Sequence, residues 1–220
     1  AFEFSSSFFS IKGLDSKYNS VSINGIELNK LYDQRPQWSN WGGLNDVDNN
    51  QEIFRDLKPN KFNFGGLSST SHINMKASSY SKGGKITLSS SNRSYNNRIL
   101  SSYATGKLKN NWYACLALGK RWGKEGFQKG TNYNSNSLFL ALEKKLNNHS
   151  INLTSIYTPT HRGKSSPNTQ EVSNLKDITY NEYWGYLNGK KRNSRIKRIE
   201  EPLFILSHDW KISNKTILYS

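Results

Sequence analysis

The stretch SLFLALEKKLNNHSINLTSIYTP (residues 137–159) contains two alternating segments separated by a short polar turn, NN. Successive residues of an extended chain point to opposite sides, so Leu138, Leu140 and Leu142 share one face. The residues between them, which begin with Phe139, share the opposite face. The pattern predicts a β-hairpin built from two long strands.

The same alternation recurs along the second half of the chain, but the segments are joined in two different ways. The alternating segments are Lys85–Ser94, Arg98–Leu108, Trp112–Lys120, Ser137–Leu146, Ser150–Pro159 and Pro202–Ile212. Tight turns at Lys109–Asn111, Asn147-Asn148 and Ser213-Asn214 alternate with long connections at Arg121–Asn136 and Thr160–Glu201. A compact domain rarely carries a loop as long as the second, whereas a transmembrane β-barrel has short turns at one rim and long loops at the other. The order of the connections therefore predicts an up-and-down transmembrane β-barrel.

Aromatic residues gather near the ends of these segments, as they do in the interfacial girdles of membrane barrels. They are Tyr95, Tyr103, Trp112, Tyr113, Trp122, Tyr157 and Trp210. A soluble β-sandwich would alternate in the same way, so alternation alone does not separate the two folds. Loop asymmetry and aromatic placement together favour the barrel.

The composition also fits a barrel wall. Apolar residues make up only 34% of the 220 residues, which is few for a soluble core, but a barrel wall needs an apolar residue only at every second strand position. No apolar stretch approaches the ~20 residues of a spanning helix, which excludes a helical membrane protein. Cys115 is the single cysteine, so disulfide frameworks and cysteine metal clusters are excluded, and we expect it to pack as a small apolar side chain.

The net charge of +15 is unevenly distributed. Residues 1–80 hold equal numbers of basic and acidic side chains, so residues 81–220 carry the whole excess. The break near Ser79–Gly84 predicts a boundary between a first domain (1–80) and a second domain (81–220). The chain opens without a signal peptide and stops as a further alternating segment begins, so we expect a fragment of a longer precursor.

Short segments punctuated by glycine make up the first domain. Phe9–Leu14 and Val21–Ile26 each read as a short strand, and the Asn-Gly of the second suits a turn with positive φ. Asn49–Leu57 fits either a short helix or a strand, and His72–Lys76 alternates as a strand. We expect a small mixed sheet with extended loops.

The motif IKGLDSKYNSVSINGI (residues 11–26) resembles the plug domain of TonB-dependent outer-membrane receptors. WSNWGGLNDV (38–47) and the segment 64–80 continue the likeness. SNRSYNNRILSSYAT (91–105) and YNEYWGYLNGKKRN (180–193) resemble the first barrel segments of Bacteroidetes-type members. The similarity covers almost the whole chain and rests on the order and spacing of these motifs. Two positions depart from the family pattern, Lys12 in place of a common arginine and the polar run Ser68–His72.

The resemblance implies a mainly β fold, with a small mixed α/β plug domain (1–80) followed by the first ~7 antiparallel strands of an incomplete transmembrane β-barrel (81–220), conventionally of ~22 strands. It implies a location in the cell outer membrane, in contact with outer-membrane lipid. The implied activity is uptake of a scarce extracellular ligand, such as a siderophore, glycan, peptide or cofactor. The TonB–ExbB–ExbD complex would supply the energy through a segment outside this chain.

The residues best suited to contact such a ligand are aromatic, because flat rings on irregular loops stack on sugars, peptides or cofactors. They are Tyr32, Trp38 and Trp41 in the plug and Trp122, Tyr183 and Trp184 in the long loops. The alternative is that these rings pack between plug and wall. The four histidines (His72, His149, His161 and His208) lack metal-ligand spacing, and no catalytic constellation stands out, so we expect no enzyme, metal or cofactor.

Two other functions stay open at this point. The polar composition and the many aromatics also fit a soluble secreted β-sandwich that binds glycans or other polymers. The basic run Lys190–Arg198 fits a phosphate-binding surface for nucleic acid. We favour a solvated loop face that touches anionic surface lipid, and therefore expect no nucleic-acid partner.

Overall fold

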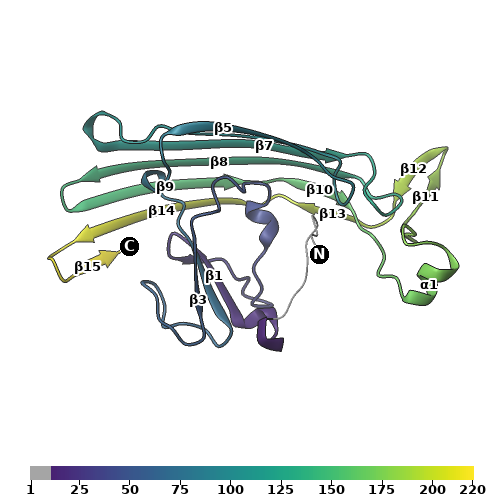
Figure 1. Ribbon diagram of the computed structural model, residues 1–220, viewed down its shortest axis with the longest axis horizontal. Coiled ribbons are helices and arrows are strands. Elements are labelled where there is room, and N and C mark those ends of the chain that lie inside the picture. Colours follow the sequence, from purple (N-terminus) through teal and green to yellow (C-terminus); the bar gives the residue numbers. More distant parts are fainter. Residues whose placement is uncertain (1–10) are drawn as a thin grey trace.

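The computed structural model describes residues 11–220, in which a large and a small β-sheet lie against each other (Figure 1). The strand order of the large sheet is β15-β14-β9-β8-β7-β6-β5, and every neighbouring pair is antiparallel. These strands are β5 (Gly83–Ser90), β6 (Asn97–Ala104), β7 (Trp112–Gly123), β8 (Tyr133–Leu146), β9 (His149–Tyr157), β14 (Pro202–Lys211) and β15 (Ile217–Tyr219). The predicted mainly β fold with sequential antiparallel strands is confirmed.

Tight turns join the strands at one end of the large sheet. β8 ends at Leu146 and β9 begins at His149, so the predicted turn between them is confirmed. β6 and β7 are joined through the 3-10 turn η5 (Lys109–Asn111), in which Asn110 and Asn111 have φ values of 56° and 59°. Asparagine adopts this left-handed conformation more readily than most residues, which explains its place in the turn.

The connection Thr160–Glu201 is not the irregular loop that the sequence predicted. It contains β10 (Thr160–Gly163), α1 (Gln170–Leu175), β11 (Trp184–Leu187), β12 (Lys190–Asn193) and β13 (Ile196–Ile199). β11 and β12 form a separate hairpin. Of the helices within residues 11–220, none has the length and apolar character to cross a membrane.

β10 and β13 prolong the large sheet beyond β9 and β14. β10 pairs with both β8 and β13. It therefore continues β9 along the edge of β8, after a break at Thr158-Pro159. Proline has no N–H to donate to a neighbouring strand, which accounts for the break. The alternating pattern is interrupted at the same place, so the sequence did not predict β10 as a continuation of the sheet.

The two faces of the large sheet differ in residue size and exposure. We call the face against the small sheet the inner face and the opposite one the outer face. Phe139 and Ala141 are buried on the inner face, whereas Leu138 is 38% exposed on the outer face. The outer face carries exposed large apolar side chains, including Ile86, Leu88, Ile99, Leu116, Leu118, Ile151, Leu153, Phe204 and Leu206. The predicted division of residues between two faces is confirmed.

Most of the predicted girdle aromatics lie on the outer face, but two do not. Tyr103, Trp112, Trp122, Tyr157 and Trp210 are exposed there. Tyr95 instead meets the buried Tyr133 with 5.6 Å between ring centroids, and Tyr113 packs against the core. The prediction was wrong for Tyr113 because it is one residue from Trp112, and neighbouring strand residues point to opposite faces.

The small sheet has the strand order β2-β1-β4-β3. Its strands are β1 (Asn19–Ile23), β2 (Ile26–Glu27), β3 (Gln51–Arg55) and β4 (Ser69–Ile73). β1 and β4 are parallel and the other pairs antiparallel, so the predicted mixed sheet is confirmed. Asn24 and Gly25, with φ values of 49° and 92°, make the predicted turn between β1 and β2.

Two predicted strands of the first domain are displaced or absent. Ile11–Gly13 forms a 3-10 turn (η1) in which Lys12 has a φ of 54°, so the predicted strand Phe9–Leu14 is wrong for this part. Phe9 and Ser10 lie outside the described residues. β4 precedes the predicted His72–Lys76, because the chain turns after Ile73 and forms the 3-10 turn η4 (Ala77–Ser79) against the large sheet.

The two sheets share one apolar core. Burial of apolar surface is worth about 25 cal/mol per Å², so this shared core is a major source of cohesion between the sheets. It includes Val21, Ile23, Ile73 and Met75 from the first part of the chain and Leu100, Cys115, Ala117, Phe139, Ala141, Ile156 and Ile205 from the large sheet. Cys115 packs as a small buried side chain, as predicted.

Buried hydrogen bonds cross the same interface. The side-chain oxygen of Asn24 accepts from the Met75 N–H at 2.8 Å, and its amide nitrogen donates to Thr154 Oγ1 on β9 at 3.0 Å. Glu143 on β8 is only 1% exposed, and its Oε2 accepts from the Ser78 N–H at 2.7 Å. A buried carboxylate needs such partners, because an unpaired one is costly in a low-dielectric interior. Lys76 forms an ion pair with Asp209 on β14 nearby.

We expect Asn24→Ala to destabilise the packing of the small sheet against the large one by about 1–3 kcal/mol, because it leaves buried hydrogen-bonding groups without partners. Asn188→Ala is the matched control, since Asn188 also has positive φ (50°) and precedes a glycine, but is exposed. Urea unfolding of both variants, followed by tryptophan fluorescence, measures the difference. Equal losses in the two variants would contradict the role of the Asn24 contacts.

Candidate ligand-binding surface

Residues 38–45 form a loop that the inner face of the large sheet holds in place. The loop opens with the 3-10 turn η3 (Trp38–Trp41). The Ser39 carbonyl accepts from Thr158 Oγ1 at 2.5 Å, and the Asn40 side-chain amide donates to Glu201 Oε2 at 2.7 Å. Ser137 Oγ on β8 donates to the Gly42 carbonyl at 2.9 Å. Strand β8 and the residues that precede β10 and follow β13 thus hold one short loop.

Two arginines complete the attachment of the 38–45 loop. Arg98 on β6 donates to the Gly43 carbonyl at 3.5 Å and to Asn45 Oδ1 at 3.2 Å. Arg121 on β7 lies against Gly43, where an added Cβ would be 2.8 Å from Arg121 Nε. Gly43 also has a φ of +86°, so both its backbone conformation and its neighbours call for glycine.

Further basic and aromatic side chains lie on the inner face near the 38–45 loop. The guanidinium carbon of Arg121 is 5.4 Å from the ring centre of Tyr133 and 6.0 Å from that of Tyr95. In the strand register Tyr133 is opposite Arg162 on β10, and Arg162 is opposite Lys197 on β13. We call Arg98, Arg121, Arg162 and Lys197 the basic strip.

The electrostatic environment of Lys197 is unfavourable for its positive charge. Burial lowers the pKa of Lys197, and the positive charges of Arg162, Lys164 and Lys30 lower it further. Glu201 acts in the opposite direction. Lys30 belongs to the first part of the chain, so the two halves of the molecule contribute basic groups to one region.

Three of the residues predicted to contact a ligand, Tyr32, Trp38 and Trp41, belong to the first part of the chain and differ widely in solvent exposure. Tyr32 is 82% exposed, and the Lys30 ammonium lies 4.6 Å from its ring centre. Trp38 is 56% exposed and meets Trp41 edge-on, with 5.4 Å between centroids. Trp41 is buried against the core, as in the alternative of packing between plug and wall. Tyr32 and Trp38 therefore have rings that are open to a ligand.

The other three predicted residues are in different places. Tyr183 and Trp184 lie in the long connection, where Arg195 is 5.4 Å from the Tyr183 ring centre and Lys191 is 4.4 Å from that of Trp184. Trp122 is exposed on the outer face of β7, separated from the basic strip by the sheet itself. The structure thus does not bring Trp122 together with the others.

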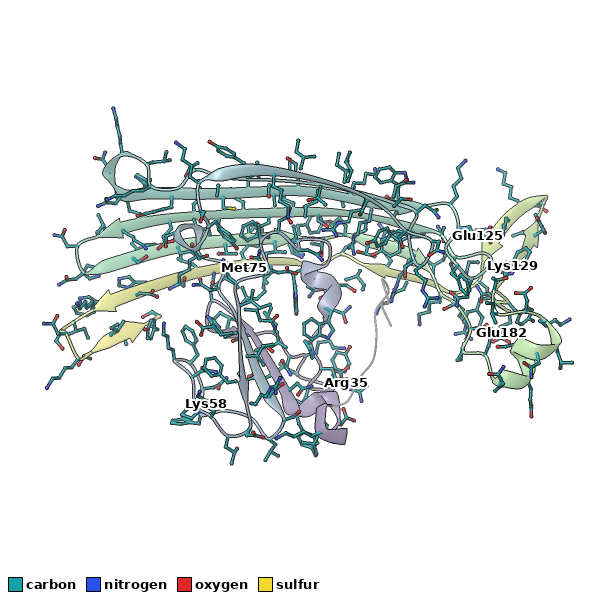
Figure 2. All side chains as sticks on the ribbon, in the orientation of Figure 1. Arg35, Lys58, Met75, Glu125, Lys129 and Glu182 are labelled. Carbon is teal, nitrogen blue, oxygen red and sulfur yellow. The ribbon has the colours of Figure 1, made fainter. Side chains whose placement is uncertain are left out.

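The connections at the β10 end of the large sheet are joined into one ordered cap. Glu125 and Lys129, both between β7 and β8, lie at this end of the sheet (Figure 2). Glu125 pairs with Lys191 of β12 at 2.5 Å, and Lys129 pairs with Asp177 at 3.1 Å. Hydrogen bonds from Thr179, together with Lys129, lower the pKa of Asp177 to about 2. The buried Asn181 donates to the carbonyls of Lys129 and Lys164. This cap holds Tyr183 and Trp184 at the end of the sheet.

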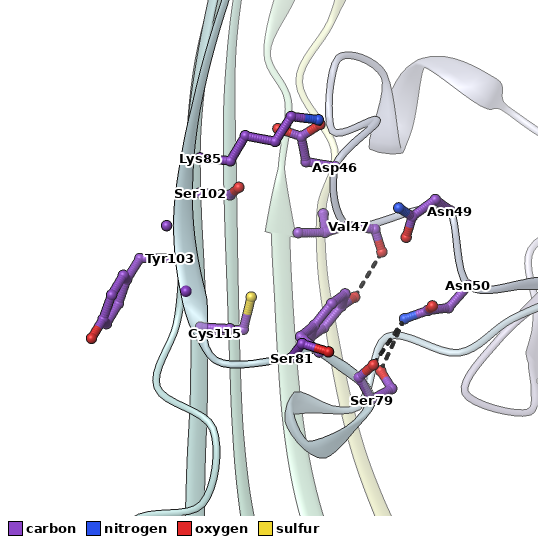
Figure 3. Close-up of a pocket in the computed structure, with 14 residues that line it drawn as sticks. Asp46, Val47, Asn49, Asn50, Ser79, Ser81, Lys85, Ser102, Tyr103 and Cys115 are labelled. Carbon is purple, nitrogen blue, oxygen red and sulfur yellow. Dashed lines mark hydrogen bonds and ion pairs between the residues drawn. The ribbon is translucent and has the colours of Figure 1, made fainter.

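A cavity of about 350 Å³ lies elsewhere, between residues 46–50 and strands β5 and β6 (Figure 3). Lys85 pairs with Asp46 at its edge, with 2.8 Å between Nζ and Oδ1. The Tyr80 hydroxyl donates to the Val47 carbonyl at 2.7 Å, and burial raises its pKa. Cys115 lines the cavity as well. The cavity could not be predicted from the sequence, because its lining comes from four separate segments.

The basic strip was also missed by the sequence analysis. Its four members are spread from residue 98 to residue 197 and share a face only once the strand register is known. The sequence could have predicted only the face on which Arg121 lies. Arg121 and Cys115 are an even number of residues apart on β7, so they share a face.

Comparison with known proteins adds a structural likeness. No family model matches the chain, and no curated protein matches it. The siderophore receptor PiuA from Acinetobacter baumannii has a similar structure, with a TM-score of 0.65 at 13% sequence identity. The chain has a receptor-like fold. The match covers 93% of this chain but 28% of that receptor, so this chain spans less than a third of its length.

We expect Gly43→Ala to loosen the 38–45 loop, because the new methyl group would press on Arg121 and Ser137 in addition to straining the backbone. Gly13→Ala is the control, since Gly13 also has positive φ (+71°) but nothing within 4 Å of an added Cβ. Hydrogen exchange of the amides of residues 38–47 measures the effect. Faster exchange in Gly43→Ala alone is expected, and unchanged exchange would show that the close packing is unimportant.

Proposed function

We propose that this chain forms the plug and the first wall strands of a TonB-dependent outer-membrane receptor that takes up a scarce extracellular ligand. The observation that carries this proposal is the arrangement of a small mixed sheet fixed to the inner face of sequential antiparallel strands, matched in a siderophore receptor over 93% of this chain. In this proposal the small sheet is the plug and the large sheet is part of the barrel wall.

The outer face supports a location in the membrane. Trp112 and Trp122 lie ten residues apart on β7 and both face outward. At ~3.4 Å per residue and a strand tilt of ~45° this spacing corresponds to a height of about 25 Å, which is the height of the apolar band in outer-membrane barrels. Beyond the band, the outer-face residues Asn134, His161 and Arg198 are polar and exposed. Lipid therefore accounts for the exposed leucines and the polar residues mark its edge.

Ligand capture falls to the end of the sheet where the cap and the 38–45 loop lie. Tyr32 and Trp38 offer exposed rings, and the basic strip offers positive charge on the inner face. Lys30, whose ammonium lies over the Tyr32 ring, also lowers the pKa of Lys197. A siderophore is the ligand class named for the structurally similar receptor, and a glycan, peptide or cofactor fits the aromatic residues as well. The Bacteroidetes-type likeness of residues 91–105 and 180–193 belongs to this proposal.

Energy for uptake would come from the inner-membrane TonB–ExbB–ExbD complex, acting on a segment outside this chain. The proposed activity is transport, and no catalytic step is part of it. Release of the ligand would require the plug to move, which involves breaking contacts such as Ser78–Glu143 and Lys76–Asp209. Water can replace each of these polar partners as the contact opens, so they separate more readily than an all-apolar interface.

The alternative of a soluble β-sandwich is not favoured. A sandwich covers the apolar face of each sheet with the other sheet. Within residues 11–220 the apolar outer face of the large sheet has no covering layer, and it is the opposite, inner face that meets the small sheet.

Uptake by the full-length protein tests the proposed function. Expression in a bacterium without its own siderophore receptors should restore growth on a scarce iron(III) chelate, and deletion of TonB should abolish that growth. Growth that does not depend on TonB, or recovery of the protein solely from the cytosol, would refute the proposal.

The proposal also fixes the orientation of the chain in the membrane. In a Cys115→Ala background of the full-length protein, cysteines at the exposed positions Ser165 and Ser194 should react with a membrane-impermeant maleimide on intact cells. A cysteine at Asn110, in the tight turn at the opposite end, should react only after the outer membrane is opened. Lipid tolerates no unpaired backbone, so the connections between the wall strands must leave it on either side. The reverse labelling pattern would show that the cap faces the periplasm, which would contradict its proposed role in ligand capture.

A further inference from the structure

We propose that Arg162 and Lys197 form an anion-binding site on the inner face, and that the ligand of this receptor carries at least two negative charges there. This inference rests on the proposed function and deepens it by naming the charge of the ligand. Three observations support it: Arg162 and Lys197 share one face of the sheet, their side chains have no acidic partner within residues 11–220, and aromatic rings lie near them.

The strand register places both side chains on the inner face. Thr160 is buried and its hydroxyl is 2.9 Å from Ser135 Oγ on β8, which fixes the inward direction of Thr160. Arg162 is two residues farther along β10 and therefore points the same way. Lys197 is directly opposite Arg162 in the antiparallel pair, so the two side chains lie next to each other on that face.

Neither charge is neutralised within the described residues. Like charges placed directly opposite each other in a sheet repel, and both side chains are half-buried, which weakens their solvation. Within residues 11–220 the side chains of Arg162 and Lys197 form no hydrogen bond and no ion pair. By contrast, Arg198 on the outer side of β13 pairs with Glu200 at 2.8 Å.

Other basic side chains near the small sheet are neutralised by ion pairs with aspartates. Lys30 pairs with Asp33, Lys76 with Asp209 and Lys85 with Asp46. Glu201 raises the pKa of Lys197 through its charge alone, since it accepts a hydrogen bond from Asn40 and forms no ion pair with Lys197. The pair on β10 and β13 therefore keeps its capacity to bind an anion.

The surroundings indicate the kind of anion. A guanidinium gives two parallel donors to a carboxylate or phosphate, and an ammonium adds a point charge, so together they suit neighbouring anionic oxygens on one ligand. The buried Tyr133, opposite Arg162, provides a ring beside them, and Tyr32 and Trp38 expose rings on the first part of the chain. A compact ligand with anionic oxygens and a flat or apolar portion matches these groups.

The experiment uses the full-length receptor in outer-membrane vesicles and two iron(III) chelates, an anionic one (citrate or a tris-catecholate) and an uncharged trihydroxamate. The variant Arg162→Gln/Lys197→Gln removes both charges. The control Arg198→Gln/Lys215→Gln removes the same charge from the outer face of β13 and from the exposed turn between β14 and β15, at the opposite end of the sheet. Unchanged heat-modifiable gel mobility verifies that each variant is folded.

We expect the wild-type receptor to bind the anionic chelate and the Arg162/Lys197 variant to bind it about 100-fold more weakly, at roughly tenfold for each charge-assisted contact. The control should bind within about threefold of wild type, and added salt should weaken wild-type binding more than variant binding. An unchanged affinity of the Arg162/Lys197 variant, or equal losses in the control, would overturn the inference.

Failure of the inference and failure of the proposed function give different results. TonB-dependent uptake of the uncharged chelate without binding of the anionic one would refute the anion site and leave the receptor function intact. Uptake of neither chelate would count against both.

Discussion

The structure depends on one constraint, which is that two sheets built from successive parts of the chain share a single buried interface. Asn24 spans that interface, because its side chain bonds both to the backbone of Met75 and to Thr154 on β9. Its backbone must also adopt the left-handed conformation of the β1–β2 turn. One residue therefore links a local turn to the docking of the small sheet. The shared apolar core around it makes separate folding of the two sheets unfavourable.

Because side chains alternate between the two faces of each strand, the shared interface also decides which residues of the large sheet face outward. Once Phe139 and Ala141 face the small sheet, the neighbouring leucines must face outward, and the register repeats this choice on β7, β9 and β14. Arg121 shares the inner face with Cys115 for the same reason. The apolar outer face and the basic strip are thus two results of one geometric rule.

The sequence predicted those features that a local pattern encodes. Alternation located the main strands, and the Asn-Asn and Asn-Gly pairs located two turns, because each of these depends only on neighbouring residues. β10 and β13 were missed because Pro159 and the Glu200-Glu201 pair interrupt the alternation. The grouping of Arg162 with Lys197 and Lys30 could not be predicted, since it depends on register and on docking between distant segments. The position of Trp122, by contrast, could be predicted from the sequence. The alternation of β7 places it on the outer face, away from the other residues predicted to contact a ligand.

The parallel pairing of β1 and β4 has a mechanical consequence. β4 is followed at once by residues 76–79, which the large sheet holds through Glu143 and Asp209. The entry to β1, at Asn19, lies at the opposite end of this pair, where it is in register with Ser69. A tension applied to the chain before Asn19 therefore pulls along the two strands and loads all their backbone hydrogen bonds at the same time. Such a shear geometry resists rupture far more than peeling bonds apart in succession, so the polar contacts with the large sheet would be the first to give way.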